Sequence, residues 1–560
     1  MNLWGVFRRD KPVSVDPDVQ QCVKLLSWIA STQVQEELHK AVDELFALAS
    51  KNNPLVQLDN SGIGTMIQLM KAQENDAGLI AQVLDVFLTM MFPREDDFNT
   101  SMISTFVGNE ANIRSLGELL FVKDSYILFK TTTLLYRFLR TKKAEKVQEV
   151  IKRTPVAINR LVELLFDRDF ICNQILLLLP VLVHRDKDLQ VIVASSASTK
   201  VLDVAKQEGG LLDGGVIAED CLRLLSTIVS DNQVAKGVFA DEAMPQLNDF
   251  LRIPSDVLSL NDKQLDILSF AVEIVRQLVL AIDHPQPGKP SSQASATNHI
   301  QNRMACLIPT LVDLSAQKGL VPNLMRQKCL GLIGPIVFRS VKNQTVLATH
   351  EIAPLLWSRF SKSSVLQSRY ALSYLLQVAM DSDDIQECAI AEYVLMSYLD
   401  SNRDGQYSIA ATFTRTESGT PTSEISAGPR RGGSQRERDR ERERERDPRA
   451  PWAQLGSMLA DYLNVMTSDF VRARRSARLI RAVLLDNVDC KDYLLSIPLE
   501  IAETPIRLLD RYGQALMSTA QATRLENSVS SAQATTALEL QVALLLLLCD
   551  WLIGCPRLLD

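Results

Sequence analysis

The histidines of this 560-residue chain are the first side chains to test for chemistry, because imidazole is the commonest metal ligand and a frequent general base. The five histidines are His39, His184, His284, His299 and His350. None begins an HExxH motif, since Pro354 stands where His350 and Glu351 would need the second histidine ligand. We therefore expect no metal ion and no metal-dependent chemistry.

The glycine-rich segment 209–215, GGLLDGG, is the next candidate, because glycine-rich loops can cradle phosphates. The Lys-Ser or Lys-Thr pair of a phosphate-binding loop does not follow it, so we expect no nucleotide cofactor. The segment is instead typical of a turn between helices, in which Asp213 accepts from the first amides of a helix over Val216–Val229. Glu219 and Asp220 lie near the start of that helix, where acids interact favourably with the helix dipole; catalysis by this pair is the less favoured alternative.

No other enzyme motif is present: a G-x-S-x-G elbow is absent, and it would require a strand that the sequence does not predict. The ionisable residues form no convergent set that would indicate a catalytic cleft. We predict that the chain is not an enzyme.

The nine cysteines form no CxxC pair, and most lie in apolar stretches, as in Leu545–Cys549. Buried free thiols in a reducing compartment are the expected reading. The residues Met1–Lys11 lack the apolar core of a secretory signal. The longest apolar runs, Ile175–Val183 and Val542–Cys549, are far shorter than the ~20 residues that cross a bilayer. We expect a cytoplasmic protein whose membrane association is peripheral.

Composition favours helices and argues against nucleic acid as the partner. Hydrophobic residues make up 46% of the chain but aromatic residues only 6%, so the core must consist mainly of Leu, Val, Ile and Ala. Such a core suits helix-on-helix packing better than a β-sandwich. The formal net charge of −7 is unlike the basic balance of most DNA- or RNA-binding domains.

Helical periodicity dominates the chain, and the helices repeat. In Leu128–Leu139, the positions of Leu128, Leu135 and Leu139 form one apolar stripe. Related blocks recur as LLYRFLRTKK from Leu134, LLPVLVHRDK from Leu178, LLSTIVSDNQ from Leu224, LIGPIVFRSVKNQ from Leu332 and LIRAVLLDNVDCK from Leu479. A period near 45 residues with two or three helices in each unit is the pattern of armadillo and HEAT arrays. The sequence therefore predicts an all-α fold, an armadillo/HEAT-like right-handed α-solenoid.

Two segments interrupt this pattern. The segment 283–297 holds three prolines and small polar residues, which predicts a surface loop. The segment 402–451 is rich in Gly, Ser, Thr and Pro and ends near the mixed-charge run Arg436–Asp447, which predicts a disordered insertion. The expected organisation is armadillo-like repeats over 1–401, the insertion, and a continuation of the solenoid over 452–560.

Several stretches resemble the globular head of the general vesicular transport factors, the Uso-type tethering proteins. The most specific is DGGVIAEDCLRLLSTIV at Asp213–Val229, followed by the NQ of Asn232–Gln233 and the VF of Val238–Phe239. A second is LLLLLCDWLIGCP at Leu544–Pro556. Weaker similarities are SRYALSYLLQVAM at Ser368–Met380, RSARLIRAVLLDNVDCKDYLL at Arg475–Leu495 and the opening MNLWGV.

The resemblance implies an armadillo-like head that tethers vesicles in endoplasmic reticulum–Golgi and intra-Golgi transport. The partners that it implies are a Rab-family GTPase, SNARE proteins and golgin-type Golgi proteins, with homodimerisation and a peripheral place on Golgi and vesicle membranes. The chain stops at Asp560, so we expect it to contain no coiled-coil tail. The alternative is an armadillo adaptor outside membrane traffic, which the mixed-charge run would support.

The resemblance also singles out a turn as a partner-binding candidate, formed by Asp213, Gly214, Gly215, Glu219 and Asp220. A packing or capping role for the same residues is the competing interpretation.

Overall fold

The computed structural model describes residues 16–553 except for 52, 54, 95–96, 167–169, 255–256, 283–293, 355, 357–368, 414–451, 453–454, 465–469 and 497–530. The chain divides into two compact units, Met1–Gln246 and Leu247–Asp560. The described residues contain helices and three isolated β-bridges but no β-strand. None of their helices combines the length and the apolar character needed to span a bilayer.

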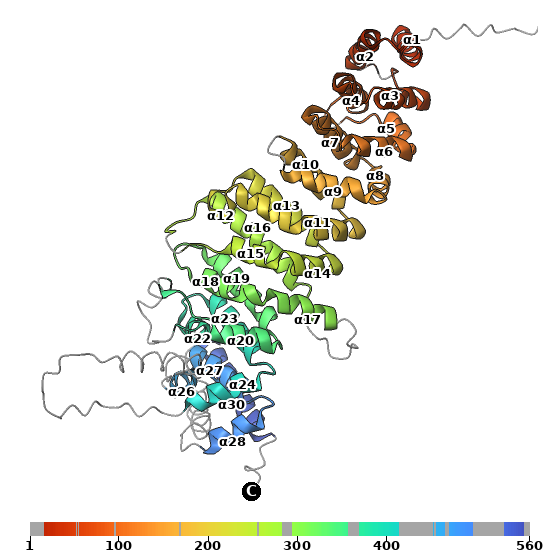
Figure 1. Cartoon of the computed structure of the whole chain (residues 1–560). Coiled ribbons are helices and arrows are strands. Elements are labelled where there is room, and N and C mark those ends of the chain that lie inside the picture. Colours follow the sequence, from red (N-terminus) through yellow and green to blue (C-terminus); the bar gives the residue numbers. More distant parts are fainter. Residues whose placement is uncertain are drawn as a thin grey trace, which may run out of the picture. The chain divides into compact units, whose positions relative to one another are not determined.

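The first unit is a succession of short helices (Figure 1). Its helices are α1 (Pro17–Ser31), α2 (Gln35–Ser50), α3 (Asn60–Ala72), α4 (Ala77–Met91), α5 (Thr100–Gly108), α6 (Glu110–Leu119), α7 (Ser125–Leu139), α8 (Ala144–Lys152), α9 (Pro155–Glu163), α10 (Ile171–Val183), α11 (Lys187–Gln207), α12 (Gly210–Asp213), α13 (Val216–Val229) and α14 (Gln233–Glu242). A 3₁₀ turn, η1, covers Leu164–Phe166. Helix α15 (Met244–Leu251) contains the boundary between the units.

Serial packing builds this unit, as the repeat predicts. Helix α2 packs on α4, α4 on α7, α7 on α10 and α10 on α13, while α11 packs on α13 and α14. Each helix buries one stripe: Leu128, Leu135 and Leu139 of α7 are all less than 5% exposed. Burial of each such leucine contributes roughly 1.5–3 kcal/mol. No single helix could bury its stripe alone, so the stacking of repeats is the source of the core.

The second unit repeats the same principle. Its helices are α16 (Asp262–Val279), α17 (Ala294–Arg303), α18 (Leu307–Ala316), α19 (Asn323–Val337), α20 (Val341–Thr349), α22 (Ala371–Asp381), α23 (Ile385–Leu399), α24 (Arg403–Ala410), α26 (Leu455–Asn464), α27 (Phe470–Leu484), α28 (Val488–Ser496) and α30 (Ser531–Leu552), with 3₁₀ turns η2 (Met304–Cys306) and η4 (Ala411–Phe413). Helix α16 packs on α19, α19 on α23, α23 on α27 and α27 on α30. The all-α, armadillo-like solenoid class is therefore confirmed.

A sharp turn with a left-handed residue joins one repeat to the next at five places in the described residues. Five non-glycine residues adopt positive φ values between 48° and 61°, and all five occupy these turns: Arg185, Asp231, Arg339, Ser401 and Asp486. The next residue of each turn begins the following helix, as Asp186, Asn232 and Asn402 do by accepting from the first backbone amides. The left-handed residue reverses the chain, and the cap satisfies the donors that the new helix start leaves open.

Buried glutamines tie successive repeats together through these turns. Gln190 donates to the backbone oxygens of Thr227 and Ser230, at 3.1 and 3.4 Å, and Gln406 donates to those of Ala482 and Leu485. The same contact to the end of a later helix is made by Gln148, Gln301 and Gln344. We call these five side chains the glutamine clasps. Each clasp satisfies carbonyl groups that a helix C-terminus leaves without a partner, and so fixes one repeat against the next.

Each of the two predicted interruptions contains some residues that the structure places in helices. Helix α17 begins at Ala294, inside the predicted loop 283–297, and residues 283–293 lie outside the described residues. Asn402 caps α24, and 403–413 are helical, with Phe413 only 1% exposed. Because these residues carry buried apolar side chains and a cap, they belong to the solenoid. The remainder of the predicted insertion, 414–451, and its charge run lie outside the described residues.

The cysteine prediction holds for most of the described thiols. Six are free and buried: Cys22, Cys172, Cys221, Cys329, Cys388 and Cys490. Cys306 is partly buried, and Cys549 is exposed. The prediction is wrong for Cys549 because the apolar run around it is a helix with two apolar sides, only one of which packs on α27.

Candidate functional site

The glycine-rich segment forms a tight loop between α11 and α13, built around the single-turn helix α12. Gly209 has φ of 102° and Gly210 of 62°, conformations that L side chains rarely adopt. A Cβ atom on Gly214 would lie 2.1 Å from the backbone oxygen of Gly210, and one on Gly209 would lie 2.4 Å from the carbonyl carbon of Asp213. The loop can close this tightly only because these positions lack side chains.

This closure overturns the predicted cap of α13. The N-cap residue is Gly215, and it makes no side-chain hydrogen bond to the helix. Asp213 is the last residue of α12, and its side chain is exposed. The prediction was wrong because it assumed that 209–215 is an irregular connection between two helices. Asp213 instead belongs to the single helical turn α12.

The two acids of α13 are engaged within their own helix. The guanidinium of Arg223 pairs with Glu219, and its Nη1 lies 3.8 Å from Oδ1 of Asp220. Burial raises the pKa of Asp220, an effect that the positive charge of Arg223 opposes. Glu219 lies in the first turn of the helix, as predicted. A carboxylate pair held by one arginine is a surface ion-pair network and does not provide an acid and a base for catalysis.

The five predicted site residues therefore lie in one loop and the first turns of α13, but they have different structural roles. Gly214 shapes the loop, while Glu219 and Asp220 pair with Arg223. Asp213 is exposed, and so is the neighbouring Val216, an apolar side chain that is 72% accessible. The edge of the loop therefore presents exposed side chains to the solvent.

Replacement of Gly214 by alanine is expected to destabilise the first unit by about 2 kcal/mol, because the new methyl group overlaps backbone that cannot move independently. Urea unfolding followed by circular dichroism measures the loss. Gly237→Ala, inside α14, is the control: nothing lies within 4 Å of its Cβ position and alanine favours a helix interior, so its unfolding midpoint should not fall. Equal midpoints for the two variants would show that the loop does not need its close approach.

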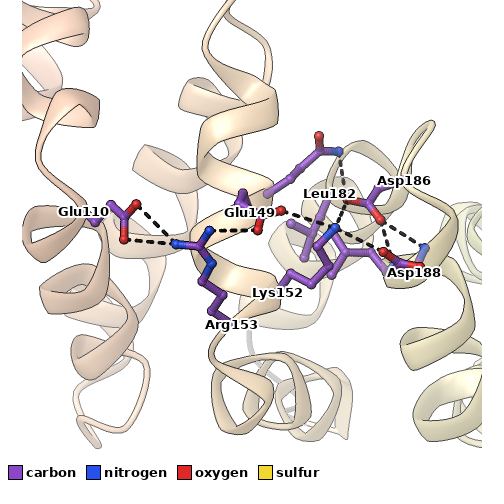
Figure 2. Close-up of polar contacts among 9 residues, drawn as sticks. Glu110, Glu149, Lys152, Arg153, Leu182, Asp186 and Asp188 are labelled. Carbon is purple, nitrogen blue, oxygen red and sulfur yellow. Dashed lines mark hydrogen bonds and ion pairs between the residues drawn. The ribbon is translucent and has the colours of Figure 1, made fainter.

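Sequence reasoning missed a charged cluster that joins three successive repeats at α8 (Figure 2). The ammonium of Lys152 lies 3.1 Å from Oδ2 of Asp186, 3.3 Å from Asp188 and 3.3 Å from Glu149. Arg153, one residue on, pairs with Glu110 of the preceding repeat at 3.3 Å and with Glu149 at 3.1 Å. The hydrogen bond to Asp186, with further bonds to the other acids, raises the pKa of Lys152, so the side chain stays charged. The sequence separation of the paired charges, 34 residues from Lys152 to Asp186 and 43 from Glu110 to Arg153, could have indicated contacts between successive repeats.

Two of the described histidines, His39 and His350, make polar contacts between helices. His39 contacts Asp76 at 2.9 Å and Gln82 at 2.7 Å, and His350 contacts Asp313 at 3.0 Å. Among the described residues, no three His, Cys, Asp or Glu side chains gather closely enough to hold a metal ion.

Serially stacked helices with a shaped loop at one edge define a class of protein, the armadillo-like repeat scaffold, whose extended surfaces recognise other proteins. No protein-family model matches the chain. Golgin candidate 6 of Arabidopsis thaliana is 25% identical over 569 residues, which cover 98% of this chain and 57% of that protein. The human general vesicular transport factor p115 is 22% identical over 573 residues, covering 99% of this chain and 52% of that protein.

A crystal structure of Uso1 shares the fold, with a TM-score of 0.58 and 15% identity over 96% of this chain and 86% of that one. These matches make the chain a relative of the general vesicular transport factors along nearly its whole length, and the predicted resemblance is confirmed. The chain spans about half the length of the curated relatives it matches.

Proposed function

We propose that this chain is the head of a vesicle-tethering factor that acts in endoplasmic reticulum–Golgi and intra-Golgi transport. The observation that carries the proposal is the match, over nearly the whole of this chain, to about half of a golgin candidate and of a general vesicular transport factor. The helical architecture supports this proposal, because stacked repeats provide extended surfaces that bind partner proteins and such binding requires no catalytic group. In this role the chain resides in the cytoplasm, peripherally on Golgi and transport-vesicle membranes.

The partners we propose are a Rab-family GTPase, SNARE proteins and golgin-type proteins. The scaffold would act before membrane fusion, and we propose that it does so as a homodimer. The loop edge at Asp213 and Val216 is our candidate contact surface, because it is exposed and held in a fixed shape by Gly209 and Gly214. The acids Glu219 and Asp220 would contribute through the ion pairs that orient them.

Recovery of the chain on immobilised Rab GTPases tests this function. We expect more of it on Rab loaded with a non-hydrolysable GTP analogue than on the GDP form. Asp213→Lys combined with Val216→Asp should reduce recovery, because it changes exposed side chains only; Gln207→Lys, an exposed change at the end of α11, is the control. Equal recovery on the GTP and GDP forms across a Rab panel would contradict the proposal.

Staining in cells separates the tether from an adaptor that works outside membrane traffic. The mixed-charge run supports the adaptor, so a variant that lacks 414–451 is the informative one; residues 403–413 must stay because they are packed in the solenoid. A tether should keep its Golgi staining without this segment, whereas dispersal of the staining would favour the adaptor.

A further inference from the structure

The turns at the ends of α7 and α10 carry a concentration of positive charge in an acidic protein. Between Arg140 and Arg153 the chain has six basic and two acidic residues, although its formal net charge is −7. The exposed cations at the two turns are Arg140, Lys142, Lys143, Arg185 and Lys187, which we call the basic ridge.

Packing of successive repeats brings the two turns to the same edge of the first unit. Helices α7 and α10 lie against each other, and the turns are the equivalent ends of these two helices. Gln148 of α8 donates to the backbone oxygen of His184 at 3.1 Å, which joins the helix that follows the first turn directly to the second turn. The ridge is therefore one continuous surface on two neighbouring repeats.

The cations of this region fall into two groups. Lys152 and Arg153 are engaged by acids of their own and neighbouring repeats (Figure 2), and Lys146 donates to the backbone oxygen of Gly108. Within the described part of the chain, Lys142, Lys143, Arg185 and Lys187 form no ion pair. Arg140 lies over the ring of Tyr136, at 5.7 Å from its centroid. The engaged cations hold α8 in place, and the ridge cations remain available.

We propose that the basic ridge binds the surface of an anionic lipid bilayer directly. Side chains at the tips of turns can contact a flat surface such as a bilayer, because this contact requires no groove in the protein. Three of the five cations are lysines, whose flexible point charges suit diffuse attraction to many head groups better than bidentate recognition of a carboxylate. Such contact goes beyond docking through protein receptors: it would orient the first unit on the vesicle or Golgi membrane.

Vesicle flotation with the full chain tests this inference. The chain should float with vesicles of phosphatidylcholine and phosphatidylserine but not with phosphatidylcholine alone, and added salt should release it. Each cation near such a surface strengthens binding roughly fivefold, so Lys142→Gln, Lys143→Gln and Lys187→Gln together should weaken it about a hundredfold. Lys24→Gln, Lys263→Gln and Lys342→Gln, three exposed lysines elsewhere, are the control with the same change of charge. Arg185 is left unchanged because its φ of 61° makes the turn sensitive to substitution.

Two results would overturn the proposal. The first is equal flotation of the ridge and control variants, which would show that total charge and not the ridge governs binding. The second is failure of the unaltered chain to float on phosphatidylserine vesicles while it binds a glutamate-rich peptide through the ridge, which would assign the surface to an acidic protein segment. Neither result bears on the Rab recovery experiment, in which the ridge variant should behave as the unaltered chain does.

Discussion

Glu387→Ala is expected to lower the free energy of unfolding of the second unit by about 3–5 kcal/mol. The side chains of Arg326 in α19 and Glu387 in α23 form an ion pair at 3.0 Å and are only 9% and 3% exposed. Arg326 also donates to the backbone oxygen of Ser315 at 3.3 Å, and Glu387 accepts from the hydroxyl of Ser382 at 2.5 Å. Removal of the carboxylate leaves a buried guanidinium without its counter-ion, which is the costly outcome.

Urea unfolding monitored by circular dichroism measures this loss, and a double variant provides its control. Arg326→Met with Glu387→Leu removes both charges together, so we expect it to recover most of the stability that the single variant loses. If the double variant is as unstable as Glu387→Ala, apolar packing and not the isolated charge explains the effect. A loss below about 1 kcal/mol in the single variant would show that water reaches the pair.

Gln190→Ala should destabilise the first unit by about 3 kcal/mol. We expect this effect to be larger than that of the same change at Gln148, the other glutamine clasp of this unit. The change leaves the backbone oxygens of Thr227 and Ser230 without their side-chain donor, and it also removes the acceptor of Asn232 at 2.9 Å. Each buried polar group that loses its partner costs about 1–3 kcal/mol. Chemical denaturation with tryptophan fluorescence and circular dichroism as probes measures the difference.

The matched control for the clasp is Gln207→Ala, which removes an exposed amide at the end of the same helix, α11. It should change stability by less than about 0.5 kcal/mol. Similar losses in the two variants would mean that helix propensity and not the contact between repeats is responsible.

The solenoid could be predicted from the sequence because it carries two periods: the 3.6-residue period of amphipathic helices and the period near 45 residues of the stacked repeats. The stripe of Leu128, Leu135 and Leu139 identified α7, and the blocks from Leu134, Leu178 and Leu224 gave the repeat that the structure confirms. The ends of the interruptions were misplaced because composition changes gradually, whereas the cap at Asn402 and the buried Phe413 act at single positions.

The glutamine clasps escaped prediction because their burial does not arise within one helix. Gln190 and Gln406 look like polar surface positions until the turn of another repeat covers them. A recognisable signal does exist: Gln190, Gln344 and Gln406 each follow the left-handed turn residue by five positions. The same difficulty applies to the candidate site, where the fate of Asp213 depended on a backbone contact between Gly214 and Gly210 that no pattern of side chains reveals.

The hydrogen-bond acceptors of the glutamine clasps affect how such a chain can gain or lose repeats. Every acceptor is a main-chain carbonyl, for example those of Ser230, Phe338 and Leu485, three residues with unrelated side chains. The side chains that donate back to Gln190 and Gln406 are both asparagines at the same turn position, Asn232 and Asn487. Such a glutamine cannot distinguish its usual neighbour from any other repeat that ends in the same turn. Duplication or loss of a whole repeat would therefore re-form the junction without compensating substitutions, whereas a shift by part of a repeat would break it.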